Sequence, residues 1–98
     1  APPVPVPQAV PQVSFDIAAV LQNARASASA GDLNASLNEY ETIIRANTAL
    51  DAVVGDLTQL AEQNMDNPAV YRVLGDSLMR QGKLQAALDT YRRALNQL

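Results

Sequence analysis

The carboxylates are the first candidates for chemistry in this sequence, because the chain has no His and no Cys. Two carboxylates can act as general acid and base only when both reach the same reacting group. Glu39 and Glu41 are two positions apart and would diverge around a helix, and Asp51 and Asp56 have no obvious partner. We therefore predict no catalytic pair and a protein that is not an enzyme.

The residue content also argues against other kinds of site. Without Cys and His, the chain lacks thiolate nucleophiles, imidazole bases and the usual zinc and haem ligands. Its 4 glycines are scattered and form no phosphate-binding loop. A net charge of -3 is unlike that of a nucleic-acid-binding domain, which is usually basic. We predict no cofactor, no metal and no nucleic-acid partner.

Composition favours one small all-helical domain. The 98 residues are 48% hydrophobic but only 4% aromatic, which favours an aliphatic, alanine-rich core with close helix packing. The sequence has no apolar run long enough to span a membrane and no basic stretch before Arg25, so we predict a cytoplasmic protein without a signal peptide. Since the chain begins at Ala1, we expect it to be part of a longer protein.

Two segments differ sharply in pattern. Residues 1–13 hold five of the 6 prolines and should form an extended linker to something upstream, with a ligand for an aromatic-lined groove as the alternative. From Ser14, which with Asp16 offers a helix cap, the apolar spacing is helical. It predicts helices over about 15–30, 33–46, 50–65, 69–80 and 84–98, with Pro68 in a first turn and Gly31 and Gly82 after helix ends.

The helices repeat with a period of 34 residues. This shift superimposes the following apolar pairs: Leu37 on Tyr71, Tyr40 on Leu74, Ile44 on Leu78, Leu50 on Leu84, Val53 on Ala87, Leu57 on Tyr91 and Leu60 on Ala94. We therefore expect helices 33–46 and 50–65 to form one hairpin, and helices 69–80 and 84–98 to form the next.

At this period residues 68–98 resemble the tetratricopeptide repeat (TPR) family. The residues that carry the resemblance are Tyr71, Leu74, Gly75 and Leu78 on the first helix, Gly82 in the turn, and Ala87, Tyr91 and Ala94 on the second. The resemblance implies an all-α, right-handed solenoid of five antiparallel helices, with two hairpins and an N-terminal capping helix. It also predicts that Gly75 lies where the next helix crosses, opposite Ala87 and Ala94.

Residues 34–67 match this pattern less well. Glu41 stands where Gly75 would be, Val53 and Leu60 replace two alanines, and Met65 replaces a closing proline, so we expect an irregular unit. A second shift, of 51 residues, relates Gly31-Asp32-Leu33, Ser36, Tyr40 and Ile43 to Gly82-Lys83-Leu84, Ala87, Tyr91 and Ala94. Helix 33–46 thus resembles both the second helix of one unit and the first helix of the next.

The resemblance implies a concave groove lined by the first helix of each unit, which holds a peptide or a partner helix. The matching positions are Asn38, Thr42, Arg45, Arg72, Asp76, Met79 and Arg80. Three arginines in one groove would suit an acidic peptide or a terminal carboxylate, because a guanidinium binds carboxylate through two hydrogen bonds. Solvation and salt bridges to neighbours such as Asp76 are the alternative role of these arginines.

We predict a non-enzymatic protein-interaction module that binds a protein or peptide. Self-association is the first alternative: residues 1–67 carry a net charge of -6 and residues 68–98 one of +3. We also expect Leu88, Leu95 and Leu98 to be exposed at the last helix. Either a further C-terminal segment covers them, or a second copy covers them in a homodimer. A regulatory domain of a larger enzyme is the other alternative.

Overall fold

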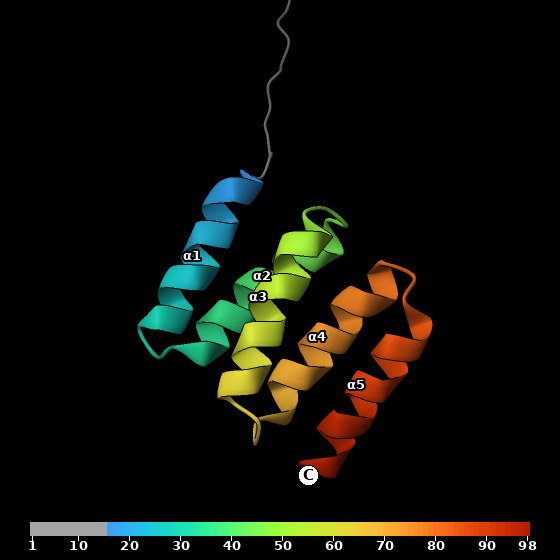
Figure 1. The fold of residues 1–98 in the computed structure, drawn as a ribbon. Coiled ribbons are helices and arrows are strands. Elements are labelled where there is room, and N and C mark those ends of the chain that lie inside the picture. The colour runs from blue at the N-terminus through green and yellow to red at the C-terminus, as the bar shows by residue number, and fades with distance from the viewer. Residues whose placement is uncertain (1–15) are drawn as a thin grey trace, which may run out of the picture.

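The computed structural model describes residues 16–98, which form five α-helices and no strand (Figure 1). The helices are α1 (Ile17–Ser29), α2 (Leu33–Arg45), α3 (Leu50–Gln63), α4 (Pro68–Arg80) and α5 (Leu84–Asn96). The all-helical prediction is confirmed. The predicted linker of residues 1–13 and the cap at Ser14 lie outside the described residues.

Local capping explains where most helices begin. The side chains of Asp16, Asp32 and Asn67 accept hydrogen bonds from backbone N–H groups in the first turns of α1, α2 and α4. Pro68 is the first residue of α4, where its missing N–H costs nothing. These caps satisfy donors that have no partner within the helix.

The turns after α1 and α4 are the same structure, 51 residues apart. Gly31 and Gly82 have φ angles of 86° and 79°, in the left-handed region that glycine adopts without strain. The closing bonds run from Asp32 N to Ser27 O at 2.9 Å and from Lys83 N to Leu78 O at 3.0 Å. This 6→1 bond satisfies a carbonyl oxygen left free at the helix end.

Helix pairing differs from the expected one. The closest packing joins α1 with α2 and α4 with α5, whereas α3 packs mainly on α4 and makes few contacts with α2. The α2–α3 connection has no glycine turn; instead, Asn47 and Ala49 adopt positive φ angles of 57° and 51°. The expected hairpin of α2 with α3 is therefore replaced by a hairpin of α1 with α2, related to α4–α5 by the 51-residue shift.

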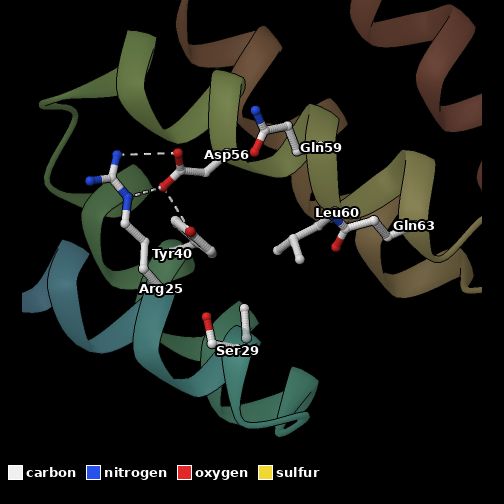
Figure 2. A pocket seen from close by; sticks show the side chains of 8 residues that line it. Arg25, Ser29, Tyr40, Asp56, Gln59, Leu60 and Gln63 are labelled. Atoms are coloured by element: carbon white, nitrogen blue, oxygen red, sulfur yellow. Dashed lines mark hydrogen bonds and ion pairs between the residues drawn. The ribbon is translucent and has the colours of Figure 1, made fainter.

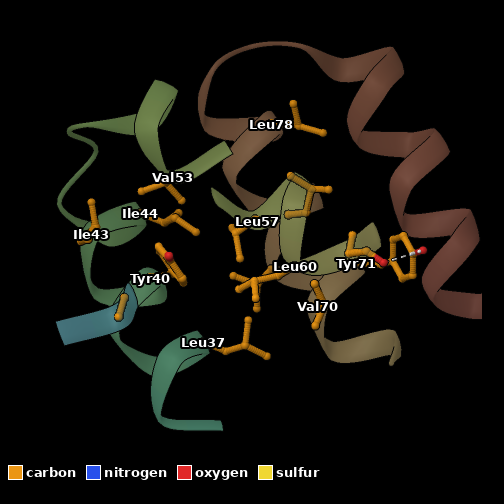
Figure 3. Close-up of a cluster of buried hydrophobic side chains, with 14 of the residues drawn as sticks. Leu37, Tyr40, Ile43, Ile44, Val53, Leu57, Leu60, Val70, Tyr71 and Leu78 are labelled. Atoms are coloured by element: carbon orange, nitrogen blue, oxygen red, sulfur yellow. Dashed lines mark hydrogen bonds between the residues drawn. The ribbon is translucent and has the colours of Figure 1, made fainter. Parts of the chain in front are cut away.

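The core is aliphatic, as predicted, and extends through all five helices (Figure 3). Its labelled side chains in Figure 3 are Leu37, Tyr40, Ile43, Ile44, Val53, Leu57, Leu60, Val70, Tyr71 and Leu78. Of the predicted packing residues, Tyr71, Leu74, Gly75, Leu78 and Ala87 are buried, and Tyr91 and Ala94 are partly buried.

Gly75 is close to a different residue from the one expected. The three atoms nearest to a Cβ built on Gly75 all belong to the ring of Tyr91, rather than to Ala87 or Ala94. A tyrosine ring lying across the helix, and not a close approach of two small residues, explains the need for glycine at this position.

Candidate peptide-binding pocket

A pocket of about 290 Å³ lies between α2, α4 and α5. Its lining consists of Glu41, Ile44 and Arg45 from α2, Asp76, Met79 and Arg80 from α4, and Tyr91 from α5. It thus brings together four residues of the predicted groove: Arg45, Asp76, Met79 and Arg80. The pocket combines an aliphatic floor at Ile44 with charged side chains at its rim.

The other three predicted residues do not line this pocket. The hydroxyl of Thr42 donates to the backbone oxygen of Asn38 at 3.1 Å, a bond within α2 itself. Arg72 lies beside the pocket and pairs with Glu41 at 3.0 Å and with Asp76 at 3.6 Å. For Arg72 the structure therefore supports the alternative role, a salt bridge to neighbouring carboxylates.

The pocket keeps two arginines whose charge is not compensated. Arg72, with one positive charge, offsets one of the two negative charges of Glu41 and Asp76, the two carboxylates of the lining. Arg45 and Arg80 are exposed, and neither forms an ion pair with any residue of 16–98. Their guanidinium groups come from facing helices and can donate to an anionic ligand.

Tyr91 belongs to this pocket, although the sequence indicated only a packing role for it. Its hydroxyl donates to Asp76, and burial, followed by that hydrogen bond and the negative charge of Asp76, raises the pKa of Tyr91 to about 12. Tyr91 is therefore neutral at ordinary pH and holds the Asp76 carboxylate in place. The 51-residue shift relates Tyr91 to Tyr40 but places Asp76 on Arg25 and not on Asp56, so it gave no signal for this role.

A second pocket, of about 240 Å³, lies between α1, α2 and α3 (Figure 2). Here Arg25 Nε is 2.7 Å from Asp56 Oδ2, and the hydroxyl of Tyr40 donates to the same oxygen at 2.8 Å. Burial is the main cause that raises the pKa of Tyr40, and the bond to Asp56 adds to it. These charged groups satisfy one another, so the cluster joins three helices rather than offering free groups to a ligand.

Three of the four carboxylates considered for acid–base chemistry each have a different partner. Asp56 pairs with Arg25, Glu41 pairs with Arg72, and Asp51 accepts a hydrogen bond of 2.7 Å from the Gln81 amide. Within residues 16–98 there is no cluster of three or more acidic side chains with the arrangement of a metal site. None of the five helices has both the length and the hydrophobicity that crossing a bilayer requires.

Comparisons of the chain with models of protein families, with curated proteins and with solved structures give no match.

Proposed function

We propose that this protein is a non-enzymatic interaction module with a TPR-like solenoid fold, which binds an acidic peptide segment in the pocket between α2, α4 and α5. The observation that carries the proposal is the convergence of Arg45 and Arg80 on one pocket, with no carboxylate of the described residues paired to either. A peptide carboxylate would supply the missing partner.

The repeat-like packing supports the solenoid part of the proposal. Residues of the TPR-like pattern, such as Leu74 and Leu78, lie in the core, and α2 and α4 are in direct contact. In the resembling family, the first helices of successive units line the binding groove; α4 holds such a place here, and α2, which pairs with α1 as α5 pairs with α4, contacts it directly. The pocket between these two helices is therefore where a ligand is expected.

The lining also fits a peptide better than a small polar ligand. Met79 is a large exposed hydrophobic residue next to Arg80, and methionine side chains adapt to partners of different shape. Arg72 is engaged by Glu41 and Asp76, and these contacts fix the two acidic groups at one side of the pocket. An acidic peptide would then bind towards Arg45 and Arg80, away from those two carboxylates.

A titration followed by amide NMR shifts tests the proposal. An acidic peptide should perturb residues of α2 and α4 around the pocket, and a neutral peptide of the same length should not. Arg45→Gln or Arg80→Gln should each weaken binding about three- to tenfold, because exposed charge-assisted bonds contribute about 1 kcal/mol each. Added salt should weaken binding by wild type more than by either variant.

Arg93→Gln is the matched control, since Arg93 is exposed and does not line the pocket. It should leave the affinity unchanged. Shifts that are absent, or that are confined to α5, would contradict the proposal, and so would an equal loss of affinity in the Arg93 variant.

A further inference from the structure

Each of the two arginines that line the peptide pocket has a carboxylate one helical turn before it. Glu41 precedes Arg45 by four residues in α2, and Asp76 precedes Arg80 by four residues in α4. All four side chains line the pocket. Residues four apart lie on the same face of a helix, and a carboxylate placed before a cation is the favourable order for an ion pair. Helix geometry alone would therefore favour two ion pairs, Glu41 with Arg45 and Asp76 with Arg80.

Arg72 pairs with both carboxylates instead. Its Nη1 atom is 3.0 Å from Glu41 Oε2 and 3.6 Å from Asp76 Oδ2. Among residues 16–98, neither carboxylate forms an ion pair with Arg45 or Arg80. Arg72 lies one turn before Asp76 in α4, whereas Arg80 lies one turn after it. The contact with Arg72 therefore draws the Asp76 carboxylate away from Arg80.

Tyr91 restrains Asp76 from a third helix, α5. Its hydroxyl donates to Asp76 Oδ1, while Oδ2 of the same carboxylate is 3.6 Å from Arg72 Nη1. The Tyr91 ring lies against Gly75, where a Cβ atom would be 2.6 Å from the ring, so the ring has a fixed position on α4. Both oxygens of Asp76 thus have partners other than Arg80.

An arginine that is already paired must give up its partner before it can bind a carboxylate of a ligand. For exposed ion pairs this competition changes a binding constant by about two- to fivefold. Two such pairs in one pocket would compete with a ligand at both arginines. Because Arg72 and Tyr91 hold the two carboxylates, an acidic ligand meets no such competition at Arg45 or Arg80.

We propose that Arg72 and Tyr91 are positioning residues of the peptide pocket. By holding the carboxylates of Glu41 and Asp76, they keep the guanidinium groups of the two lining arginines available to an acidic peptide. Neither residue has to contact the ligand for this effect. This role rests on the proposed function of the pocket and adds to it the two residues that prevent the pocket from pairing with itself.

Tyr91→Phe is the first test, with a short oligoglutamate peptide as the probe. The substitution removes the hydroxyl, keeps the ring beside Gly75 and changes no charge at neutral pH. It should weaken binding about two- to fivefold, because Asp76 becomes free to pair with Arg80. In the Asp76→Asn background the same substitution should have no effect. An equal loss in both backgrounds would mean that the ligand binds the Tyr91 hydroxyl directly, and would overturn the positioning role.

Arg72→Gln is the second test. The variant releases Glu41 and Asp76 and also removes a cation, so it should weaken oligoglutamate binding more than Tyr91→Phe does. In the Glu41→Gln/Asp76→Asn background the loss should be about twofold smaller or less still, because only the lost charge then matters. Equal losses in the two backgrounds would show that Arg72 does not act through the carboxylates. Arg93→Gln, which removes a cation outside the pocket, should bind like the wild type.

The side-chain Nε–H signals of Arg45 and Arg80 in NMR spectra report the same effect without any ligand. In the free protein, Tyr91→Phe should shift the Arg80 signal and Arg72→Gln should shift both signals, whereas Arg93→Gln should shift neither. Signals that keep their wild-type positions in the first two variants would overturn the positioning role. Phenylalanine keeps the ring and Arg72 is about half exposed, so both variants should keep the helical circular-dichroism signal of the wild type.

Failure of this role and failure of the proposed function give different results. If the wild type does not bind oligoglutamate, the proposed function is contradicted, and the arginine signals of the free protein still decide whether the carboxylates are restrained. If Arg45→Gln and Arg80→Gln weaken binding but Tyr91→Phe and Arg72→Gln bind as tightly as the wild type, the pocket keeps its function and the positioning role is overturned.

Discussion

A Cβ atom built on Gly75 would lie 2.6 Å from Cε1 of Tyr91, a distance too short for two carbon atoms. The hydroxyl of Tyr91 donates to Asp76, which directly follows Gly75 in α4. The Tyr91 ring is therefore held against α4 at Gly75, where only a glycine, without a Cβ atom, leaves room for the ring. This contact joins α4 and α5 and also forms one wall of the proposed peptide pocket.

Gly75→Ala should destabilise the protein even though alanine is the better helix former. The new methyl group must displace the Tyr91 ring, and overpacking of this kind costs about 1–3 kcal/mol. The gain in helix propensity offsets about 1 kcal/mol of that cost. We expect a net loss of about 1 kcal/mol in the free energy of unfolding, measured by urea denaturation.

Gly55→Ala is the matched control for this substitution. Gly55 lies within α3, and no other group lies within 4 Å of a Cβ built on it. Alanine there should stabilise the protein by about 0.5–1 kcal/mol through helix propensity alone. If the two variants change stability in the same direction, contact with Tyr91 does not explain Gly75.

Tyr40→Phe should destabilise the protein by about 1–2 kcal/mol, because it removes a part-buried hydrogen bond to the charged Asp56 carboxylate. Tyr71→Phe is the comparison, since the Tyr71 hydroxyl makes a longer bond, 3.4 Å, to the backbone oxygen of Ala61. It should cost less. Thermal and urea unfolding of both variants measure the difference, and an equal or larger loss for Tyr71→Phe would contradict the role given to the Arg25–Asp56–Tyr40 cluster.

Helix positions were predictable because their signals are local. Asp32, Asn67 and Pro68 begin helices, and Gly31 and Gly82 follow helix ends, each through the conformation or hydrogen bonds of a few neighbouring residues. These residues place the helices along the chain without reference to tertiary structure.

Helix pairing was less predictable, because two internal shifts compete in the sequence. The 34-residue shift preserves apolar character at many positions, but the 51-residue shift preserves the glycine turn and relates Tyr40 to Tyr91. The connection after α2 depends on Asn47 and Ala49 in left-handed conformations, and an alanine gives no signal for such a turn.

The candidate pocket was predictable only in part, because its contacts depend on how the helices pair. Arg45 and Arg80, two residues of the predicted groove, line one pocket. The pairing of Arg72 with Glu41 joins residues of different helices, 31 positions apart, and depends on how α2 and α4 contact each other. No spacing rule within one helix could have indicated it.

Stability should fall as the pH rises from about 10 to about 12. In the folded protein the pKa of Tyr91 is raised from 10.0 to about 12, and that of Tyr40 is raised as well. Between the unfolded and folded pKa values the unfolded chain has lost protons that the folded chain still holds, so unfolding becomes more favourable. Below about pH 10 Tyr40 and Tyr91 are protonated in both the folded and the unfolded state, and the stabilisation linked to their raised pKa values is fully present.

Urea unfolding at a series of alkaline pH values measures this dependence. The double variant Tyr40→Phe/Tyr91→Phe should show a shallower decline above about pH 10, since it lacks both groups. Tyr71→Phe leaves both tyrosine–aspartate bonds intact and should keep the wild-type slope. A double variant with an unchanged slope would show that other groups cause the alkaline loss.

Ala49→Gly should stabilise the protein by up to about 1 kcal/mol, because Ala49 precedes α3 with φ of 51°, where a Cβ atom is unfavourable. Ala46→Gly, three residues earlier, is the control: Ala46 has φ of -75°, so glycine there removes no strain and should destabilise by about 0.5–1 kcal/mol. Thermal melts of the two variants should shift in opposite directions. If Ala49→Gly lowers the melting temperature as much as Ala46→Gly, the left-handed turn before α3 is not strained, and the route by which α3 leaves α2 to pack on α4 needs another cause.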